Sequence, residues 1–300
     1  MVALDGSDHA LVGLAYVACL ALSSADEVIL VSVAENEPIP ARAFRRQHGR
    51  HLSLLLQASW AARRTAAQRT VEQGQIRLGE WQTPVAQVVR SGHPVKVIAG
   101  LIEELGADLL VLGPRGRGQL AALLIGSVTQ SLLGLARCPV VVAREPVNPV
   151  RRVILAVDGS RHADAATRTL TVFPLADSAN IDVLTVVTPW MAPDHDDSAG
   201  GPAGLLAAQE EAAGEIAARA VEALTAAGLQ ARASVRTGDP GREIVAAART
   251  MSADLVVVGS RGRGGVRGLF LGSVSRRVTA TAPCSVLVVP ALRQPRRVPC

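Results

Sequence analysis

The chain has 300 residues, 49% of them hydrophobic and only 2% aromatic, so its cores must be built from aliphatic side chains. This length predicts two domains of ordinary size. The net charge is +5, but the cations are scattered arginines, with Lys96 as the only lysine, and no aromatic platform accompanies them, which argues against nucleic-acid binding. Four cysteines without a C-x-x-C pair favour a reduced, cytoplasmic compartment.

An uncharged segment, residues 10–25, lies close to the N-terminus. Asp5 and Asp8 precede it, where a signal peptide would have Lys or Arg, and the segment is short for a membrane span. We therefore predict a buried first helix and no membrane association. Its counterpart in the second half, residues 163–172, is more polar, so the first helix is a candidate to cover an interface.

The two halves of the chain repeat one another. Asp158-Gly-Ser follows Asp5-Gly-Ser by 153 residues, whereas Asp254, which opens an apolar strand, follows Asp108 by 146. The first copy therefore has seven additional residues, which we place around its second helix. Domains are predicted at 1–143 and 152–290, with a linker at 144–151 and a tail at 291–300.

Each copy alternates strands with helices, which predicts an α/β fold with a five-stranded parallel sheet covered on both faces. The first-copy strands are expected near 2–4, 28–33, 85–89, 109–112 and 140–143. The second-copy strands are expected at 153–157, 181–187, 229–235, 254–258 and 285–289, with helices at 163–172, 205–227, 241–251 and 273–281. The first strand starts at Met1 and is shorter than its counterpart, which predicts a weak edge or a start upstream. Residues 189–204 are predicted to form a mobile loop.

A glycine-rich motif follows the fourth strand of each copy with the same spacing. It consists of Gly113, Gly116, Gly126 and Ser127 in the first copy and of Gly259, Gly262, Gly272 and Ser273 in the second. Glycines let the backbone approach a ligand closely, and the Gly-Ser pair begins a helix whose N–H groups and dipole favour phosphate. One such motif would equally fit a plain strand-to-helix turn, but two with identical spacing favour ligand binding.

The motif predicts where a ligand would lie. In open α/β sheets ligands bind outside the carboxyl ends of the strands, so Asp5 and Asp158, at the ends of the first strands, are expected in the same crevice as the loops. Ser127 and Ser273 are expected either to cap their helices or to donate to a phosphate oxygen.

Both halves resemble universal stress protein domains, whose nucleotide motif is Gly-x₂-Gly-x₉-Gly-Ser/Thr, over essentially the whole chain. The resemblance implies Rossmann-like, adenine nucleotide α-hydrolase-like domains that bind ATP, with or without Mg²⁺, and that pair through their last strands. It also implies a role in stress response or signalling, through an unknown regulatory partner and with further dimerisation possible. The site residues that it implies are Asp5, Val33, Gly113, Gly116, Gly126, Ser127, Val128, Asp158, Val186, Gly259, Arg261, Gly262, Gly272, Ser273 and Val274. Pro114, where the second copy has Ser260, is expected to stiffen the first loop.

Catalytic patterns are weak in this sequence. Neither loop contains the lysine of a P-loop NTPase, and Arg117 and Arg263 are either partial substitutes or solvated charges. His9 and His162 are expected to be polar caps. The acidic cluster at 194–197 is expected to be solvated and not to bind a metal, and Trp190 either covers adenine or packs. Three functions stay open: an ATP-binding regulatory protein, a slow ATPase or nucleotide transferase, and a partner-binding module that does not use nucleotide.

Overall fold

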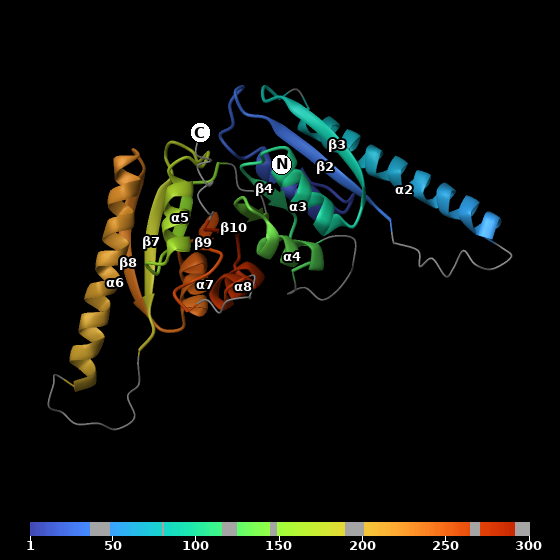
Figure 1. Ribbon diagram of the computed structural model, residues 1–300. Coiled ribbons are helices and arrows are strands. Elements are labelled where there is room, and N and C mark those ends of the chain that lie inside the picture. The colour runs from blue at the N-terminus through green and yellow to red at the C-terminus, as the bar shows by residue number, and fades with distance from the viewer. Residues whose placement is uncertain are drawn as a thin grey trace, which may run out of the picture.

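The structure is a computed structural model that describes residues 1–36, 49–79, 81–115, 125–144, 149–189, 201–264 and 271–291, with the backbone alone for 49–55 and 201–203. Strands and helices alternate through both halves of the described chain (Figure 1). Gly116, Arg117, Trp190, the cluster at 194–197 and most of the predicted loop at 189–204 lie outside the described residues.

In the first half the strands are β1 (Val2–Ala3), β2 (Val28–Glu35), β3 (Val85–Gly92), β4 (Leu110–Leu112) and β5 (Val140–Val142). The helices between them are α1 (Asp8–Val17), α2 (Gly49–Leu78), α3 (Pro94–Glu104) and α4 (Ser127–Leu135).

The second half repeats this order with β6 (Arg152–Ala156), β7 (Asn180–Val187), β8 (Gln230–Thr237), β9 (Leu255–Gly259) and β10 (Ser285–Val289). Its helices are α5 (Arg161–Leu170), α6 (Gly201–Ala226), α7 (Pro240–Thr250) and α8 (Ser273–Thr281). The predicted bounds of β10 and α8 are confirmed, and the other predicted elements of this half are present with ends shifted by a few residues.

The two predicted five-stranded parallel sheets are joined into one. Over the described residues the strand order is β3-β2-β1-β4-β5-β10-β9-β6-β7-β8. Every neighbouring pair is parallel except β5 and β10, which pair antiparallel with Val141 opposite Leu287. The halves therefore meet through their last strands, as the family resemblance implies.

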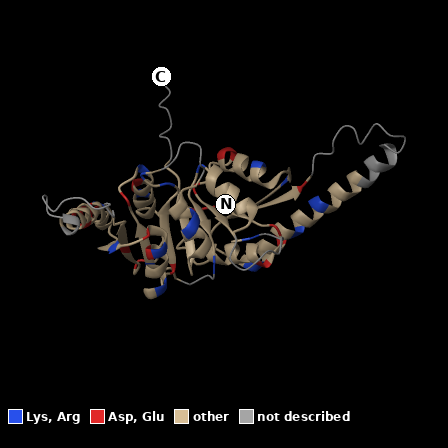
Figure 2. Cartoon of the chain, turned by 90° about the horizontal axis from the view of Figure 1, so that it is seen from below, with Lys and Arg blue, Asp and Glu red and all other residues tan. Residues whose placement is uncertain are grey.

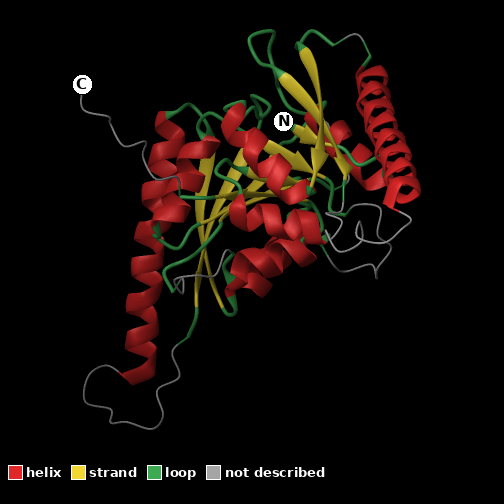
Figure 3. Cartoon of the chain, turned by 45° about the vertical axis from the view of Figure 1, so that its right-hand side comes forward, coloured by secondary structure: helices red, strands yellow, loops and turns green. Residues whose placement is uncertain are grey.

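Helices cover both faces of this sheet (Figure 3). Leu155 and Leu287 face a core that includes residues of α1, α2, α5 and α6, whereas Ile154 and Val286 face a second core that includes residues of α3, α4, α7 and α8. This alternation follows from the period of two along a strand. Both cores contain residues of both halves, so burial is continuous across the β5–β10 pair.

Helix α1 is shorter than the uncharged segment that predicts it. It ends at Val17, and the chain then turns, with the backbone N–H and hydroxyl of Ser23 donating to Oδ2 of Asp26. Such local side-chain bonds compete with helix continuation. The helix is buried on one side, and Tyr16 is only 1% exposed. Just beyond α1, the N–H of Ala21 donates to the carbonyl of Pro174, so this segment lies against the second half. That α1 covers an interface stays a prediction.

The first strands of the two halves, β6 and β1, are held in place by different hydrogen bonds. Asp254 is buried, and its Oδ2 accepts from the backbone N–H groups of Arg151 and Arg152, while its Oδ1 lies 2.8 Å from Nη2 of Arg152. Burial raises the pKa of this carboxyl, but the hydrogen bonds from Arg152 and Arg151 outweigh burial and lower it. Its counterpart Asp108 is exposed, and β1 is held at its start by the Met1 ammonium, which donates to the carbonyl of Leu109.

The matching cysteines pack inside the molecule. Burial raises the pKa of Cys138 to about 11 and that of Cys284 to about 12, so both thiols stay protonated, which agrees with the predicted packing role. None of the described helices is long and apolar enough to cross a membrane. In the view of Figure 2, acidic and basic residues are scattered over the described part of the chain.

Candidate functional site

Each half of the sheet has a cavity at the carboxyl ends of its strands. One is lined by the ends of β1, β2 and β4, and the other by the ends of β6, β7 and β9. Because β5 and β10 run antiparallel, the carboxyl ends of the two halves point to opposite edges of the common sheet. We call the first-half cavity site 1 and the second-half cavity site 2.

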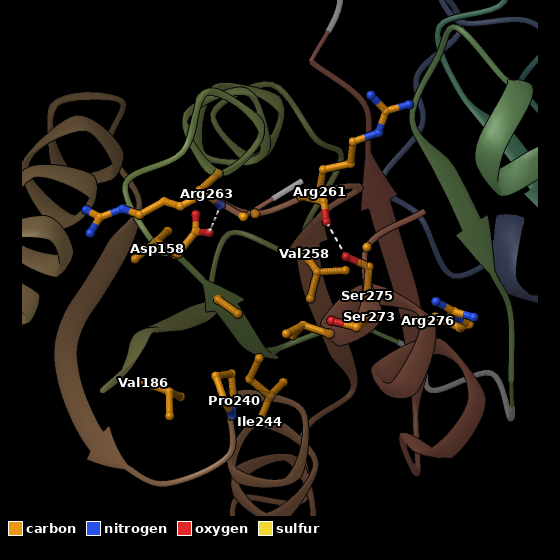
Figure 4. A pocket seen from close by; sticks show the side chains of 18 of the residues that line it. Asp158, Val186, Pro240, Ile244, Val258, Arg261, Arg263, Ser273, Ser275 and Arg276 are labelled. Atoms are coloured by element: carbon orange, nitrogen blue, oxygen red, sulfur yellow. Dashed lines mark hydrogen bonds between the residues drawn. The ribbon is translucent and has the colours of Figure 1, made fainter. Parts of the chain in front are cut away.

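Site 2 has a volume of about 510 Å³, within the range of small-molecule sites. Its apolar side is formed by residues of β7 and α7, among them Val186, Pro240 and Ile244, which lie together in Figure 4. Asp158, at the end of β6, and the glycine loop lie across the cavity from this wall. The site therefore offers an apolar surface to one end of a ligand and backbone and polar groups to the other.

The glycine loop of site 2 is bound to the first strand through Asp158. Oδ1 of this aspartate accepts from the N–H of Ser160, and Oδ2 accepts from the N–H of Arg263, each at 3.0 Å. Gly262 passes so close that an added Cβ would lie 2.6 Å from Oδ2. Asp158 thus fixes the loop that lines the cavity, and any larger residue at 262 would displace its carboxylate.

The glycine that ends β9 has a packing role. A Cβ on Gly259 would lie 2.8 Å from the carbonyl carbon of His162, at the start of α5. The carbonyl of Gly259 accepts from Oγ of Ser275, in the first turn of α8, at 2.6 Å. This glycine therefore brings together the starts of two helices. At position 259 the motif thus serves the packing of a strand-to-helix turn.

Helix α8 begins at the cavity without a side-chain cap. Its N-cap is Gly272, which makes no side-chain capping bond, whereas α5 and α7 are capped by Ser160 and Asp239. The first N–H groups of a helix have no partner within it and attract anions. Ser273 is the first helical residue and is exposed at the cavity, so of its two predicted roles capping is wrong.

Arginines surround site 2. Arg261, Arg263 and Arg276 all line it. The side chains of Arg261 and Arg263 run away from Ser273 in Figure 4, and an added Cβ on Gly159 would lie 2.5 Å from Nη2 of Arg263, so this guanidinium lies over the turn after β6. These charges favour an anion in the cavity by their field, without a lysine in the loop.

Site 1 repeats this plan with about 890 Å³ of volume. An added Cβ on Gly113 would lie 2.1 Å from the carbonyl oxygen of His9, and the carbonyl of Gly113 accepts from Oγ1 of Thr129 at 3.1 Å. Helix α4 also has a glycine N-cap, Gly126, with no side-chain capping bond. The strand-to-helix geometry is therefore the same in both halves.

Two differences separate the sites. Arg63, on α2, lines site 1, and its Nη1 donates to the carbonyl of Glu35 at 2.6 Å. In the loop, Pro114 stands where site 2 has Ser260, so site 1 lacks both an N–H and a hydroxyl at this position. In site 2 that N–H donates to the carbonyl of Val289, at the end of β10.

The structure brings the predicted residues together within each half. Site 1 is lined by Asp5, Val33, Gly113, Gly126, Ser127 and Val128, while Gly116 is outside the described residues. Site 2 is lined by Asp158, Val186, Gly259, Arg261, Gly262, Gly272, Ser273 and Val274. Their role in binding a nucleotide stays a prediction.

Some lining residues were missed. Pro94 and Ile98 in site 1, and Pro240 and Ile244 in site 2, come from the helices that follow β3 and β8. The repeated Gly-x-Pro after the third strand of each copy is the signal that marks them. Arg63 has no such signal, because the sequence of α2 is not repeated in α6.

The histidines also differ from expectation. Ser7 and Ser160 cap α1 and α5 by accepting from the N–H groups of Ala10 and Ala163, so His9 and His162 are not caps. His9 is exposed, whereas His162 is buried. Within the described part of the chain, no group of three or more His, Cys, Asp and Glu side chains is placed to hold a metal ion.

The fold and the paired cavities define a doubled α/β protein with one cavity at each of the two edges where the strands of its halves end. The family model described as the universal stress protein family matches residues 1–144 and 149–290. A universal stress protein of Mycobacterium tuberculosis is 33% identical over 261 residues, which cover 84% of this chain and 80% of that protein. The chain therefore belongs to the universal stress protein family, as a member with tandem domains.

Other relatives agree with this doubling. A universal stress protein of Thermus aquaticus is 38% identical over 141 residues, covering 46% of this chain but 98% of its own length. The crystal structure of a universal stress protein from Archaeoglobus fulgidus covers 97% of both chains, with a TM-score of 0.62 and 20% identity. A putative universal stress protein from Pseudomonas aeruginosa gives a TM-score of 0.58 at 19% identity over 96% of this chain and 91% of its own. These likenesses show the fold.

Proposed function

We propose that the protein binds ATP, with or without Mg²⁺, in both cavities and acts in stress response or signalling through the conformation or partner that nucleotide favours. The observation that carries this proposal is the convergence in site 2 of an uncapped helix start, a glycine loop held on Asp158, and an apolar wall. The helix start suits phosphates, and the apolar wall suits a base.

Holding the nucleotide, and not turning it over, is the activity that these residues support best. Lys96 is the only lysine of the chain and lies in α3, so neither glycine loop supplies the lysine that P-loop NTPases place on the phosphates. Asp158 is already bound to two backbone N–H groups, which suits a structural contact to the loop and the ligand more than the positioning of water. Slow hydrolysis would appear as phosphate release that is abolished when Ser127→Asp and Ser273→Asp are combined.

Ser127→Asp and Ser273→Asp test the proposal in matched positions. Each places a carboxylate at the first residue of the helix, where the helix dipole stabilises it but where it repels a bound phosphate. Calorimetric titration with Mg²⁺ and ATP should give two nucleotides per chain in the original protein, one in each single variant and none in the double variant.

Ser127→Ala and Ser273→Ala are the controls, because they remove the hydroxyl without adding charge. Their stoichiometry should remain two. Unchanged circular dichroism and thermal unfolding in the aspartate variants would show that a lost site is not a lost fold. Two nucleotides bound by the double variant would refute the assignment of these loops to phosphate. The predicted cytoplasmic location, the homodimer, the protein partner and the domain boundaries stay predictions.

A further inference from the structure

His162 joins two segments that are distant in the sequence. Its side chain is buried, with 7% exposed, in the first turn of α5. Its Nδ1 lies 2.9 Å from the backbone N of Ala291 and 3.0 Å from Oγ of Ser260. Because a backbone N–H can only donate, Nδ1 must carry the lone pair, and the neutral ring carries its proton on Nε2. The Ser260 hydroxyl then acts as a donor to the same nitrogen.

Ser260 is itself a junction beside site 2. Its N–H donates to the carbonyl of Val289 at 2.7 Å, and its carbonyl accepts from the N–H of Gly272, the N-cap of α8, at 2.8 Å. The next residues along the chain, Arg261 and Gly262, line the cavity. A side chain that holds Ser260 therefore holds the loop between β9 and α8 against the end of β10.

We propose that His162 is a positioning residue for site 2, whose neutral imidazole fixes the glycine loop through Ser260 and the end of β10 through Ala291, and whose protonation breaks the bond to Ala291 and turns Ser260 from donor to acceptor. The proposal rests on the nucleotide binding proposed above and adds a regulatory input to one of the two sites. His162 does not line the cavity, so its action passes through the loop.

The surroundings of His162 keep it neutral. Burial lowers its pKa, the positive charges of Arg161 and Arg261 lower it further, and Asp158 opposes them. The neutral form is therefore favoured in the folded protein relative to the unfolded chain. The interaction is fully present above the ordinary histidine pKa of about 6.5 and is lost as the pH falls through the lowered value.

The first half contains a natural comparison. His9 occupies the matching position in α1 but is exposed, and Pro114 replaces the serine that His162 contacts. Proline has no N–H and no hydroxyl, so the relay of site 2 has no chemical counterpart in site 1. Sensitivity to acid through this device is therefore expected at site 2 alone.

The test uses His162→Asn and His162→Ala in the Ser127→Asp background, where site 2 alone takes ATP. Asparagine places an amide oxygen close to where Nδ1 lies and accepts at every pH, whereas alanine removes the acceptor. Calorimetry at neutral pH should show ATP binding weakened roughly tenfold by His162→Ala and nearly unchanged by His162→Asn. On acidification the affinity of the parent should fall more steeply than that of His162→Asn. His9→Ala is the matched control and should change neither value.

Amide hydrogen exchange without ligand separates this proposal from the nucleotide assignment. Acidification should reduce the protection of the Ala291 and Ser260 amides in the original protein, once intrinsic exchange is corrected, and leave it unchanged in His162→Asn. Equal protection in both proteins at all pH values would overturn the positioning function. If no ATP binds to the original protein, the proposed function fails, and the exchange result still decides whether His162 holds the loop.

Discussion

The two halves share a strand-to-helix plan but differ in what holds it in place. In site 2 the loop after β9 is tied to β10 through Ser260 and to α5 through His162. In site 1 Pro114 stands at the matching position and His9 is exposed. The same motif can therefore be stabilised by a hydrogen-bonded relay or by the stiffness of a proline ring, and only the relay responds to protonation.

The largest expected effect comes from the glycine that ends the fourth strand. Gly113→Ala would place a Cβ 2.1 Å from the carbonyl oxygen of His9, and backbone must move to accommodate it. We expect a loss of about 3 kcal/mol or more in the free energy of unfolding of the protein, measured by urea denaturation. Gly259→Ala, where the closest atom is 2.8 Å away, should cost less. The reverse order would contradict the packing described here.

The next effect tests the unequal support of the first strands. Asp254→Ala removes the buried carboxylate that accepts from Arg151 and Arg152, and should cost about 2 to 3 kcal/mol. Asp108→Ala, at the exposed matching position, should change stability by about 0.5 kcal/mol or less.

The pH dependence of Asp254 has a defined sign. Its pKa is lowered in the folded protein, so its stabilisation is complete above the ordinary aspartate pKa of about 3.9 and is lost as the pH falls through the lowered value. Thermal unfolding followed from neutral to acidic pH should show the difference between the original protein and Asp254→Ala shrinking below about pH 4. A difference that stays constant with pH would mean that the stabilisation does not come from the ionised Asp254 carboxylate.

Exchanging the loop residues should sharpen the comparison. Ser260→Pro gives site 2 the residue of site 1 and removes the bonds to Val289 and His162, which should lower the free energy of unfolding by about 2 kcal/mol in denaturant titrations. Pro114→Ser restores an N–H in site 1 and should alter stability by less than about 1 kcal/mol. Equal costs in the two directions would mean that the relay contributes nothing.

The smallest predicted effect is on ATP affinity, from a substitution that leaves the core of the protein unchanged. Gly262→Ala would bring a Cβ to within 2.6 Å of Oδ2 of Asp158 on an exposed loop, so the carboxylate must turn while the core is untouched. We expect the affinity for ATP at site 2 to fall roughly tenfold, equal to about 1.4 kcal/mol, by calorimetry. Gly264→Ala, whose added Cβ meets open space, is the control.

Much of the fold could be predicted because the same pattern of strands, helices and glycines occurs in both halves of the sequence. Strand β10 and helix α8 have their predicted bounds, since Gly272 marks the start of α8 and apolar residues fill β10. The end of α1 could not be placed, because an uncharged segment does not show where Ser23 and Asp26 form a turn. The joining of the two sheets came from the family resemblance alone, because sequence period says nothing of which edges meet.

The site was predicted less completely than the fold. The glycines, Asp5 and Asp158 were found because they recur at fixed spacing in both halves. The contact between His162 and Ser260 was missed, since the histidine is matched by His9 and the repeat suggested one function for both. The substitution of Ser260 by Pro114 was the available signal. A difference between repeats, read together with its neighbours in space, marks where the halves diverge.

The most direct test titrates ATP into Ser127→Asp protein, which retains site 2, and Ser273→Asp protein, which retains site 1, between about pH 7.5 and about pH 5.5. Protonation of ATP itself affects both titrations alike. We predict one nucleotide per chain in each protein, with an affinity that falls more steeply on acidification in the Ser127→Asp protein. The absence of binding in both proteins, or the same pH profile in both, would contradict the account.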